Sequence, residues 1–322
     1  HHTRGHLLIF MPGAFHINKT ISACRRLITD RSIPILPLHG SLTPAQQDQA
    51  EAASKTQKII LATNVAETSI TIDDIGCVID SGLARIHRYD TQRAIDLLTT
   101  EPISQASAAQ RSGRAGRTKE GDCIRLWTAK DHANRDAFTT SEIQRSDLSD
   151  VLLTLMSMNI KAPTTFPWLQ PPEAKGTSDA IEHLIELGAC DAGHLISKMG
   201  KQMSRFPLSP GLARVLVEAN QRDCLGSALI QVALLNERDI VDRLTRQQIQ
   251  QWQDPDQMPS DLAARAALFT TWLNDKRQTP QLATGACHEL KQAIRQLSAT
   301  CKQLGWQIKP DESTSLQQTV TR

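Results

Sequence analysis

Short apolar segments alternate with helix-like segments through the first 127 residues, and no other feature constrains the fold as strongly. The apolar segments end at Pro, Gly or polar residues and have the length of strands. They occupy residues 7–11, 33–38, 58–62, 76–80 and 123–127. Between them apolar residues recur at helical spacing, as at Ile17 and Ile21. Strands separated by helices predict an α/β domain with a mostly parallel sheet and helices on both faces.

The pattern changes twice further along the chain. Between residues 83 and 100 apolar and polar residues interleave around Tyr89 without a helical period, which predicts a β-hairpin projecting from the sheet. From Ser141 onward the strand signals almost vanish, and a proline-rich segment at 164–173 is typical of a linker. A helix, a turn, a short strand and another helix then follow closely, which predicts a winged-helix module. The remaining apolar positions are helical.

Composition excludes several classes of protein. With 40% hydrophobic and 22% charged residues over 322 positions, the chain is expected to fold, into two or three domains. No apolar run is long enough to span a bilayer, so no membrane association is expected. A net charge of +2 excludes binding by bulk charge alone, and 4% aromatic residues argue against a surface built mainly to stack bases. Seven scattered cysteines without a C-x-x-C pair disfavour a zinc site or a disulfide scaffold and fit a reducing cytoplasm.

The most specific motif is an arginine–glycine cluster that begins at Gln110. Arg111, Arg114 and Arg117 lie within seven residues and are separated by glycines. On a helix Arg114 and Arg117 would share a face, and planar guanidinium groups suit phosphate oxygens and the charge of a transferring phosphoryl group. The alternative is a solvated basic turn. The glycine spacing and the leading glutamine favour the phosphate interpretation.

Two further segments follow predicted strands, where α/β sheets bind ligands. Residues 63–73 begin with Thr63 and Asn64, whose small polar side chains can donate to phosphates; a capped strand-to-helix turn is the alternative. His39 precedes Gly40 and Ser41 after another strand. A hydrolase dyad is rejected, because residues so close in sequence rarely form the required hydrogen bond and no acidic group stands nearby. Phosphate contact by Gly40 and Ser41 is favoured, with an inert turn as the alternative.

Two ATPase motifs are absent from the sequence. The only Gly-Lys pair, at Gly200, has Leu195 where G-x-x-x-x-G-K-S/T requires glycine. The only Asp-Glu pair, Asp311 and Glu312, is followed by Ser313 and does not form D-E-x-H. The chain alone is therefore expected to be inactive as an ATPase.

These motifs together resemble those of the DEAH/RHA helicases. Residues 110–117 (QRSGRAGR) resemble motif VI of that family, residues 63–72 (TNVAETSITI) motif V, and residues 7–13 (LLIFMPG) motif IV. DEAD-box proteins usually begin motif VI with His-Arg, so Gln110 favours the DEAH type. Many relatives have Glu where this chain has His16. The resemblance covers about residues 5–241, and the residue sequences of these segments are most similar to those of the bacterial HrpB type.

The resemblance implies three domains. Residues 1–130 would form a second RecA-like domain with a β-hairpin at 83–100. Residues 131–206 would form linker helices and a winged-helix domain. Residues 207–322 would form an all-α, ratchet-like helical domain.

The resemblance also implies roles for individual residues. In this family ATP lies between two RecA-like domains, and the first supplies the P-loop lysine, the Mg²⁺ ligands and the general base. This chain would contribute groups around the γ-phosphate, other ATP contacts, and contacts to the nucleic-acid backbone. The expected catalytic residues are Gln110, Arg114 and Arg117; the expected ATP-binding residues are Ser69, Asp73 and Arg111; the expected nucleic-acid contacts are Gly13, Gly40, Ser41, Thr63 and Asn64. No metal ligand is expected in this chain.

The expected function is the C-terminal motor portion of an ATP-dependent helicase. Such a portion couples ATP hydrolysis to translocation on single-stranded nucleic acid, with RNA as the expected strand. Its partner would be a first RecA-like domain in cis. The alternative is a catalytically inactive nucleic-acid-binding or adaptor module that keeps the RecA-like fold.

Overall fold

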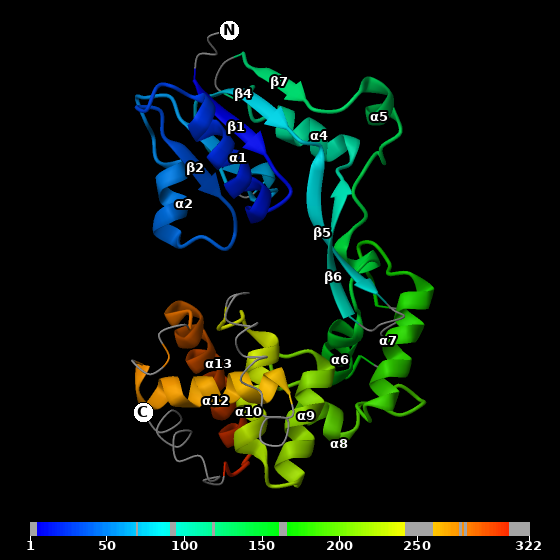
Figure 1. Ribbon diagram of the computed structural model, residues 1–322. Coiled ribbons are helices and arrows are strands. Elements are labelled where there is room, and N and C mark those ends of the chain that lie inside the picture. Colours follow the sequence, from blue (N-terminus) through cyan, green and yellow to red (C-terminus); the bar gives the residue numbers. More distant parts are fainter. Residues whose placement is uncertain are drawn as a thin grey trace. The chain divides into compact units, whose positions relative to one another are not determined.

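The computed structural model of the chain describes residues 5–68, 70–90, 95–117, 120–160, 166–241, 260–276, 279 and 282–308 (Figure 1). The chain divides into two compact units, His1–Ser146 and Asp147–Arg322. Each unit has its own core and is described by itself. The domain boundaries at 130 and 206 stay predictions.

A five-stranded parallel sheet forms the centre of the first unit, as the alternation of strands and helices predicted. The strands have the order β2-β3-β1-β4-β7. They are β1 (His6–Phe10), β2 (Ile35–Leu38), β3 (Ile59–Ala62), β4 (Ile75–Asp80) and β7 (Asp122–Arg125). The near-continuous apolar character of β1, β3 and β4 is typical of parallel strands buried on both faces.

All five strands end in register. Leu38, Ala62, Phe10, Asp80 and Arg125 are paired across the sheet at the last position of their strands. After four of the strands the next backbone amide continues the pairing: the amides of Met11, Thr63, Ser81 and Leu126 each donate to the last carbonyl of a neighbouring strand at 2.8–3.2 Å. The loops after the strands therefore emerge along one line. We call this line the carboxyl edge.

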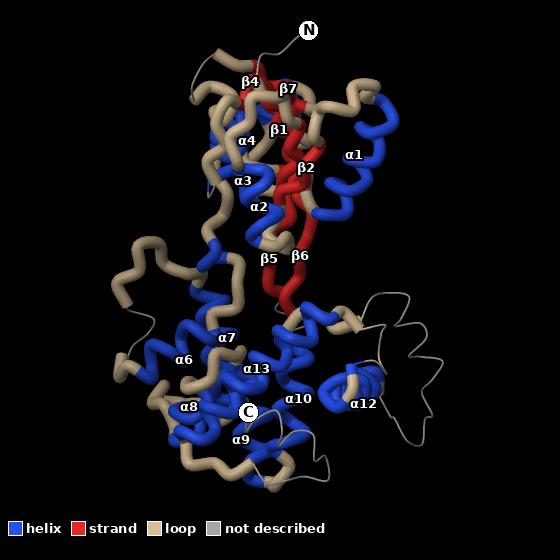
Figure 2. The backbone as a smooth tube through the Cα atoms, turned by 90° about the vertical axis from the view of Figure 1, so that its left-hand side faces the viewer, coloured by secondary structure: helices blue, strands red, loops and turns tan. Residues whose placement is uncertain are grey.

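Helices cover the two faces of the sheet unequally (Figure 2). Helix α1 (Ala14–Leu27) lies on one face, where Ile17 and Ile21 pack in a cluster with strand residues such as Leu61. Helices α2 (Pro44–Glu51), α3 (Val65–Thr68) and α4 (Gln105–Ser112) lie on the other face. The core there contains Leu8, Phe10, Leu38, Ile60 and Val78. Successive strand residues thus supply both cores, because their side chains alternate between the faces.

The predicted hairpin is present. Strands β5 (Leu83–Asp90) and β6 (Ile95–Pro102) pair antiparallel, with Leu83 opposite Pro102. Two short helical segments follow in this unit, α5 (Ala129–Ala133) and the 3₁₀ helix η1 (Glu142–Gln144). Arg145, directly after η1, accepts a hydrogen bond from the Tyr89 amide through its carbonyl, and its guanidinium donates to the His87 carbonyl. Strand β5 is therefore anchored along its length as well as at its base.

The described part of the second unit is helical, with one short strand pairing. Cys190 and Ile196 form an isolated antiparallel bridge between α7 and α8, in agreement with the predicted winged-helix arrangement. The described helices are α6 (Ser149–Ser157), α7 (Ala174–Glu186), α8 (Lys198–Met203), α9 (Pro210–Gln221), α10 (Leu225–Asn236), α12 (Asp261–Asn274) and α13 (Thr284–Gln303). Helix α10 is apolar on nearly all sides because α9, α12 and α13 surround it. No helix in the described ranges is long and apolar enough to cross a membrane.

A close approach inside the winged-helix segment gives a test of this packing. A Cβ added at Gly200 of α8 would overlap the carbonyl of Ala189, whereas one added at Gly211 of α9 meets nothing within 4 Å. We expect Gly200→Ala to lower the free energy of unfolding by about 1–3 kcal/mol through overpacking. Gly211→Ala should leave it unchanged or raise it by up to about 1 kcal/mol. Urea denaturation followed by circular dichroism measures both; equal stabilities would contradict the packing described.

Candidate functional site

A completely buried arginine lies at the centre of the motif VI segment. The side chain of Arg111 on α4 is 0% exposed. Its Nε donates to Glu67 Oε2 at 2.9 Å and its Nη1 to Asp80 Oδ1 at 2.9 Å, and Nη1 also reaches the Leu83 carbonyl at 3.3 Å. The guanidinium lies 4.7 Å from the centre of the Phe10 ring. One side chain thus ties together α3, α4, the end of β4 and the start of β5.

The carboxylates of this cluster have further donors. Ser107 Oγ donates to Glu67 Oε1 at 2.6 Å, and the Gly82 amide donates to Asp80 Oδ1 at 2.8 Å. Burying charges costs several kcal/mol per ion unless partners and hydrogen bonds compensate. The two carboxylates and their extra donors supply much of that compensation, while Arg111 Nη2 and Asp80 Oδ2 are buried without a hydrogen-bond partner among the described residues. Arg111 therefore faces inward and is not exposed to a ligand.

Arg114 holds the motif V segment against α4. Its side chain is almost fully buried and donates from Nη1 to the Ile70 carbonyl at 2.8 Å and from Nη2 to the Glu67 carbonyl. Burial lowers the pKa of Arg114, and the nearby charge of Arg117 lowers it further. The two carbonyls flank Ser69, a predicted ATP contact that lies outside the described residues.

Three of the other predicted ATP-site residues are exposed. Gln110 precedes these buried arginines along the motif and Arg117 follows them, and Asp73 lies at the end of the motif V segment. Arg117 Nη1 donates to Thr71 Oγ1 at 3.2 Å. Motifs V and VI are thus packed into one unit, with Arg117 and Gln110 on its surface. Guanidinium and amide donors of this kind suit phosphate oxygens.

All five predicted nucleic-acid contacts lie at the carboxyl edge. Gly13 follows β1, Gly40 and Ser41 follow β2, and Thr63 and Asn64 follow β3. The strand order β2-β3-β1 places these three loops side by side. The space beside Gly40 is open, since an added Cβ would meet nothing within 4 Å. The sheet topology thus brings together residues from three separate motifs.

One sequence argument about this edge was wrong. Ser41 Oγ lies 2.8 Å from His39 Nδ1, so residues two apart do form the hydrogen bond that we judged improbable. Burial lowers the pKa of His39. No described carboxylate hydrogen-bonds to the imidazole, and an acidic partner is the third part of a hydrolytic triad. The second reason for rejecting a hydrolase therefore stands.

Comparison with known proteins assigns the family. The model "Helicase conserved C-terminal domain" matches residues 1–119, and "Helicase associated domain (HA2), winged-helix" matches residues 180–208. The ATP-dependent RNA helicase HrpA of Escherichia coli is 38% identical over 246 residues, which are 75% of this chain and 19% of that protein. A crystal structure of the Escherichia coli DEAH/RHA helicase HrpB has a TM-score of 0.69 and 30% identity, covering 84% of this chain and 34% of that one. The chain belongs to the DEAH/RHA helicase family.

Further relatives agree with that assignment. The probable ATP-dependent RNA helicase DHR2 of Saccharomyces cerevisiae is 34% identical over 74% of this chain and 34% of its own length. The Escherichia coli DExH-box NTPase HrpB has a TM-score of 0.68 with 29% identity, over 90% of this chain and 33% of that one. This chain spans between 19% and 34% of the length of the curated relatives it matches. Both HrpA-type and HrpB-type proteins are thus similar to it, whereas the resemblance of its motifs had pointed to the HrpB type.

Sequence reasoning missed the acidic partners of this helicase domain. Glu67 lies inside the motif V segment and Asp80 ends a buried strand. A carboxylate at the end of an otherwise apolar strand indicates a buried cation partner, and that signal was available. Arg85, whose Cδ lies 3.0 Å from where a Cβ of Gly13 would be, carried no comparable signal. Only the folded hairpin brings Arg85 to motif IV.

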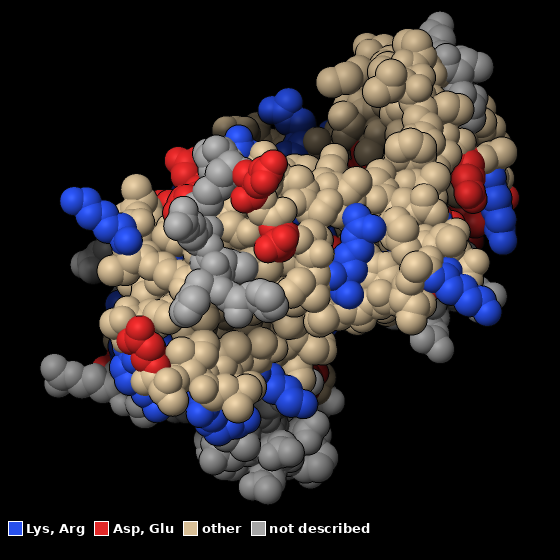
Figure 3. Space-filling model, turned by 90° about the horizontal axis from the view of Figure 1, so that it is seen from above, with Lys and Arg blue, Asp and Glu red and all other residues tan. Residues whose placement is uncertain are grey.

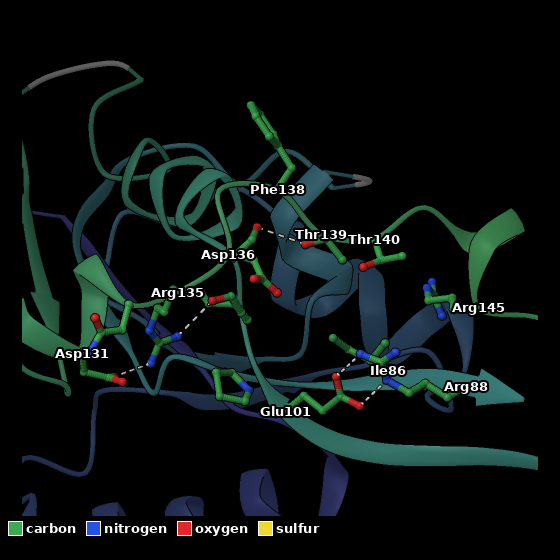
Figure 4. A pocket seen from close by; sticks show the side chains of 14 residues that line it. Ile86, Arg88, Glu101, Asp131, Arg135, Asp136, Phe138, Thr139, Thr140 and Arg145 are labelled. Carbon is green, nitrogen blue, oxygen red and sulfur yellow. Dashed lines mark hydrogen bonds and ion pairs between the residues drawn. The ribbon is translucent and has the colours of Figure 1, made fainter. Parts of the chain in front are cut away.

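A cavity of about 240 Å³ lies at the base of the hairpin (Figure 4). Arg88 and Glu101 face each other across the strands with two hydrogen bonds, Nε–Oε1 at 2.6 Å and Nη2–Oε2 at 2.7 Å. Arg135 on the wall donates to the carbonyls of Gly82 and Ile103. None of the predicted site residues lines this cavity. The ion pair therefore joins the two strands of the hairpin, and the hydrogen bonds of Arg135 hold its base to the segment that follows α5.

Loss of the Arg111 cluster should unfold this helicase domain. We expect Arg111→Ala to lower the free energy of unfolding by about 3–5 kcal/mol, because Asp80 would remain buried, and Glu67 partly buried, without a cation. Arg117→Ala, at an exposed position of the same motif, should change it by less than about 0.5 kcal/mol. Urea denaturation of the two variants measures both changes. Equal losses of the free energy of unfolding would contradict the structural role assigned to Arg111.

The hairpin should lose stability in acid. Hydrogen bonds from Arg88 and then from Thr99 lower the pKa of Glu101 from 4.5 to about 2. A folded-state pKa below the unfolded value contributes stability that is fully present above pH 4.5 and is lost as the pH falls toward 2. We therefore expect the stability difference between the wild type and Glu101→Gln to shrink steadily below pH 4.5. Denaturant titrations at several pH values measure it. Arg88→Ala should remove the same dependence, and a difference independent of pH would contradict the assignment.

Proposed function

We propose that this chain is the C-terminal motor portion of an ATP-dependent RNA helicase. The observation that carries the proposal is the locking of motif V to motif VI. Arg111 hydrogen-bonds to Glu67 and Asp80, and Arg114 hydrogen-bonds to the Ile70 carbonyl. This arrangement leaves Arg117 and Gln110 on the surface. The names of HrpA and DHR2 as ATP-dependent RNA helicases support RNA as the substrate class.

The exposed donors fit ATP. Arg117 and Gln110 would hold the γ-phosphate and the attacking water, with Ser69 and Asp73 as further contacts. Arg114 would keep the motif V segment in place, and the buried position of Arg111 supports a positioning role for it. Among the described residues no group of three His, Cys, Asp or Glu side chains is arranged to hold a metal. Following the family resemblance, we assign the Mg²⁺ ligands to a first RecA-like domain. Bound MgATP supplies the phosphoanhydride bond that is hydrolysed, and the Arg117 charge would stabilise the negative charge that builds there.

The carboxyl edge would bind the single strand of RNA. Gly13, Gly40, Ser41, Thr63 and Asn64 have small side chains that let backbone amides approach phosphates closely. Lys and Arg are interspersed with Asp and Glu on the face seen in Figure 3, in keeping with the net charge of +2. RNA binding would therefore come from local contacts. The winged-helix and helical domains would cover the bound RNA strand, so that each cycle of ATP hydrolysis moves the protein along it in one direction. The protein would act in the cytoplasm.

The test is turnover by a helicase in which a first RecA-like domain is joined to this chain. Arg117→Ala should lower kcat for ATP by about 10³-fold or more, the usual effect of an arginine finger. RNA affinity should be unchanged, because Arg117 does not lie at the carboxyl edge. Arg205→Ala, an exposed arginine of the second unit, is the matched control.

The isolated chain should not hydrolyse ATP, because it has no G-x-x-x-x-G-K-S/T motif. Adding a separately produced first domain should restore RNA-stimulated turnover. Failure to restore it, with RNA binding retained, would favour the adaptor function instead. Near-normal turnover by Arg117→Ala would reject the assigned role of the arginine.

A further inference from the structure

An exposed aromatic pair lies two residues beyond the Gly13 loop. Phe15 is 73% exposed, although Ile17 and Ile21 of the same helix are buried against the sheet. The rings of Phe15 and His16 lie 5.5 Å apart and meet edge to face at 88°. Such contacts hold a ring in a defined orientation. Phe15 thus takes no part in the core, yet its ring is supported by a neighbour.

The topology places this pair at the carboxyl edge. Helix α1 begins at Ala14, directly after β1 and the Gly13 loop. The Cα–Cβ bonds of a helix tilt toward its N-terminus, so the second residue of α1 leans toward this edge. Strand β1 lies between β3 and β4. Phe15 therefore stands between the Thr63 loop and the loop that leads into the hairpin.

Two cations lie close to Phe15 in the fold. The side chain of Arg85 crosses from β5 to Gly13 and is exposed, and it makes no ion pair with a described residue. Lys19 follows Phe15 by one helical turn. Helix α1 contains three basic residues and no Asp or Glu. An apolar ring close to cations that form no ion pair with the described residues complements a polyanion that carries flat apolar groups, and single-stranded nucleic acid has this chemistry.

We propose that Phe15 stacks on an unpaired base of a single strand bound along the carboxyl edge, with Arg85 on a neighbouring phosphate. This inference rests on the proposed function, because it adds a base contact to the backbone contacts assigned there. Every base has a π-face, so the contact tolerates any sequence. His16 supports the ring from its edge. The contact gives the edge a means to distinguish a strand with bases from a bare phosphate chain.

The experiment compares two probes on the 322-residue chain. One is a fluorescent oligouridylate of about ten nucleotides, and the other is an abasic ribose-phosphate chain of equal length. Phe15→Ala should weaken binding of the oligouridylate by about fivefold or more and leave the abasic probe unaffected. Phe15→Trp should retain the affinity, whereas Phe15→Leu, which keeps an apolar side chain, should behave like Phe15→Ala. Phe138→Ala removes another exposed phenylalanine (77%) and should change neither affinity.

Arg85→Ala should weaken both probes and reduce the salt slope by about one unit, as expected for a lost phosphate contact. Circular dichroism melting should be unchanged in Phe15→Ala, because the side chain is exposed. Equal weakening of both probes by Phe15→Ala, or no weakening of either, would overturn the stacking inference while the proposed function stands. The second of these results is expected if another protein surface covers Phe15. Absence of salt-dependent binding by the wild type would overturn the proposed function and the stacking contact together.

Discussion

The guanidinium of Arg111 lies between the buried carboxylate of Asp80 and the partly buried carboxylate of Glu67, and the geometry of the motif V and motif VI segments depends on that contact. Glu67 belongs to the short helix α3, and Asp80 ends the strand β4. Without the cation between them, the two carboxylates would repel each other in a core where charge is costly. Arginine suits this place because its planar fork can donate in two directions at once. Helix α4 is thereby held against the sheet, and the residues that follow Arg111 are directed outward.

One short segment of the chain connects the carboxyl edge to the exposed side chain of Arg117. Residues 63–73 begin at the carboxyl edge with Thr63 and continue to Thr71, which accepts the hydrogen bond from Arg117. Arg114 grips the carbonyls between these ends. A helicase must couple ATP hydrolysis at its nucleotide site to its contacts with the bound nucleic-acid strand. The segment provides a direct physical link between the two proposed sites, because the same backbone reaches both of them.

The hairpin adds a second connection to that edge. Its base is braced by the Arg88–Glu101 pair and by Arg135, and its first strand carries Arg85 to the Gly13 loop. Motif IV and the hairpin are more than seventy positions apart in the sequence. Their proximity follows from the crossover that places β1 next to β4. This crossover brings Arg85, which makes no ion pair with a described residue, to the loop that precedes the exposed Phe15.

Much of this protein could be predicted from its sequence, because local signals carried the information. The alternation of apolar and helical segments predicted the parallel sheet. The segment of interleaved apolar and polar residues predicted the hairpin, and the residue sequences of motifs IV, V and VI predicted the family. The roles assigned to single residues within those motifs stay predictions. What the motifs could not reveal was the direction of each side chain. Arg111, Arg114 and Arg117 look alike in the sequence, yet one is fully buried, one is nearly so and one is exposed.

The sequence by itself determined the order of the strands and helices and the chemistry available in each loop, because these depend on residue type and spacing over a few positions. The tertiary structure alone decided which loops became neighbours and which charges were buried. Those outcomes depend on strand order and on partners far apart in the chain. Asp80 became the partner of Arg111, and Arg85 came to lie across Gly13, only when the sheet brought them together.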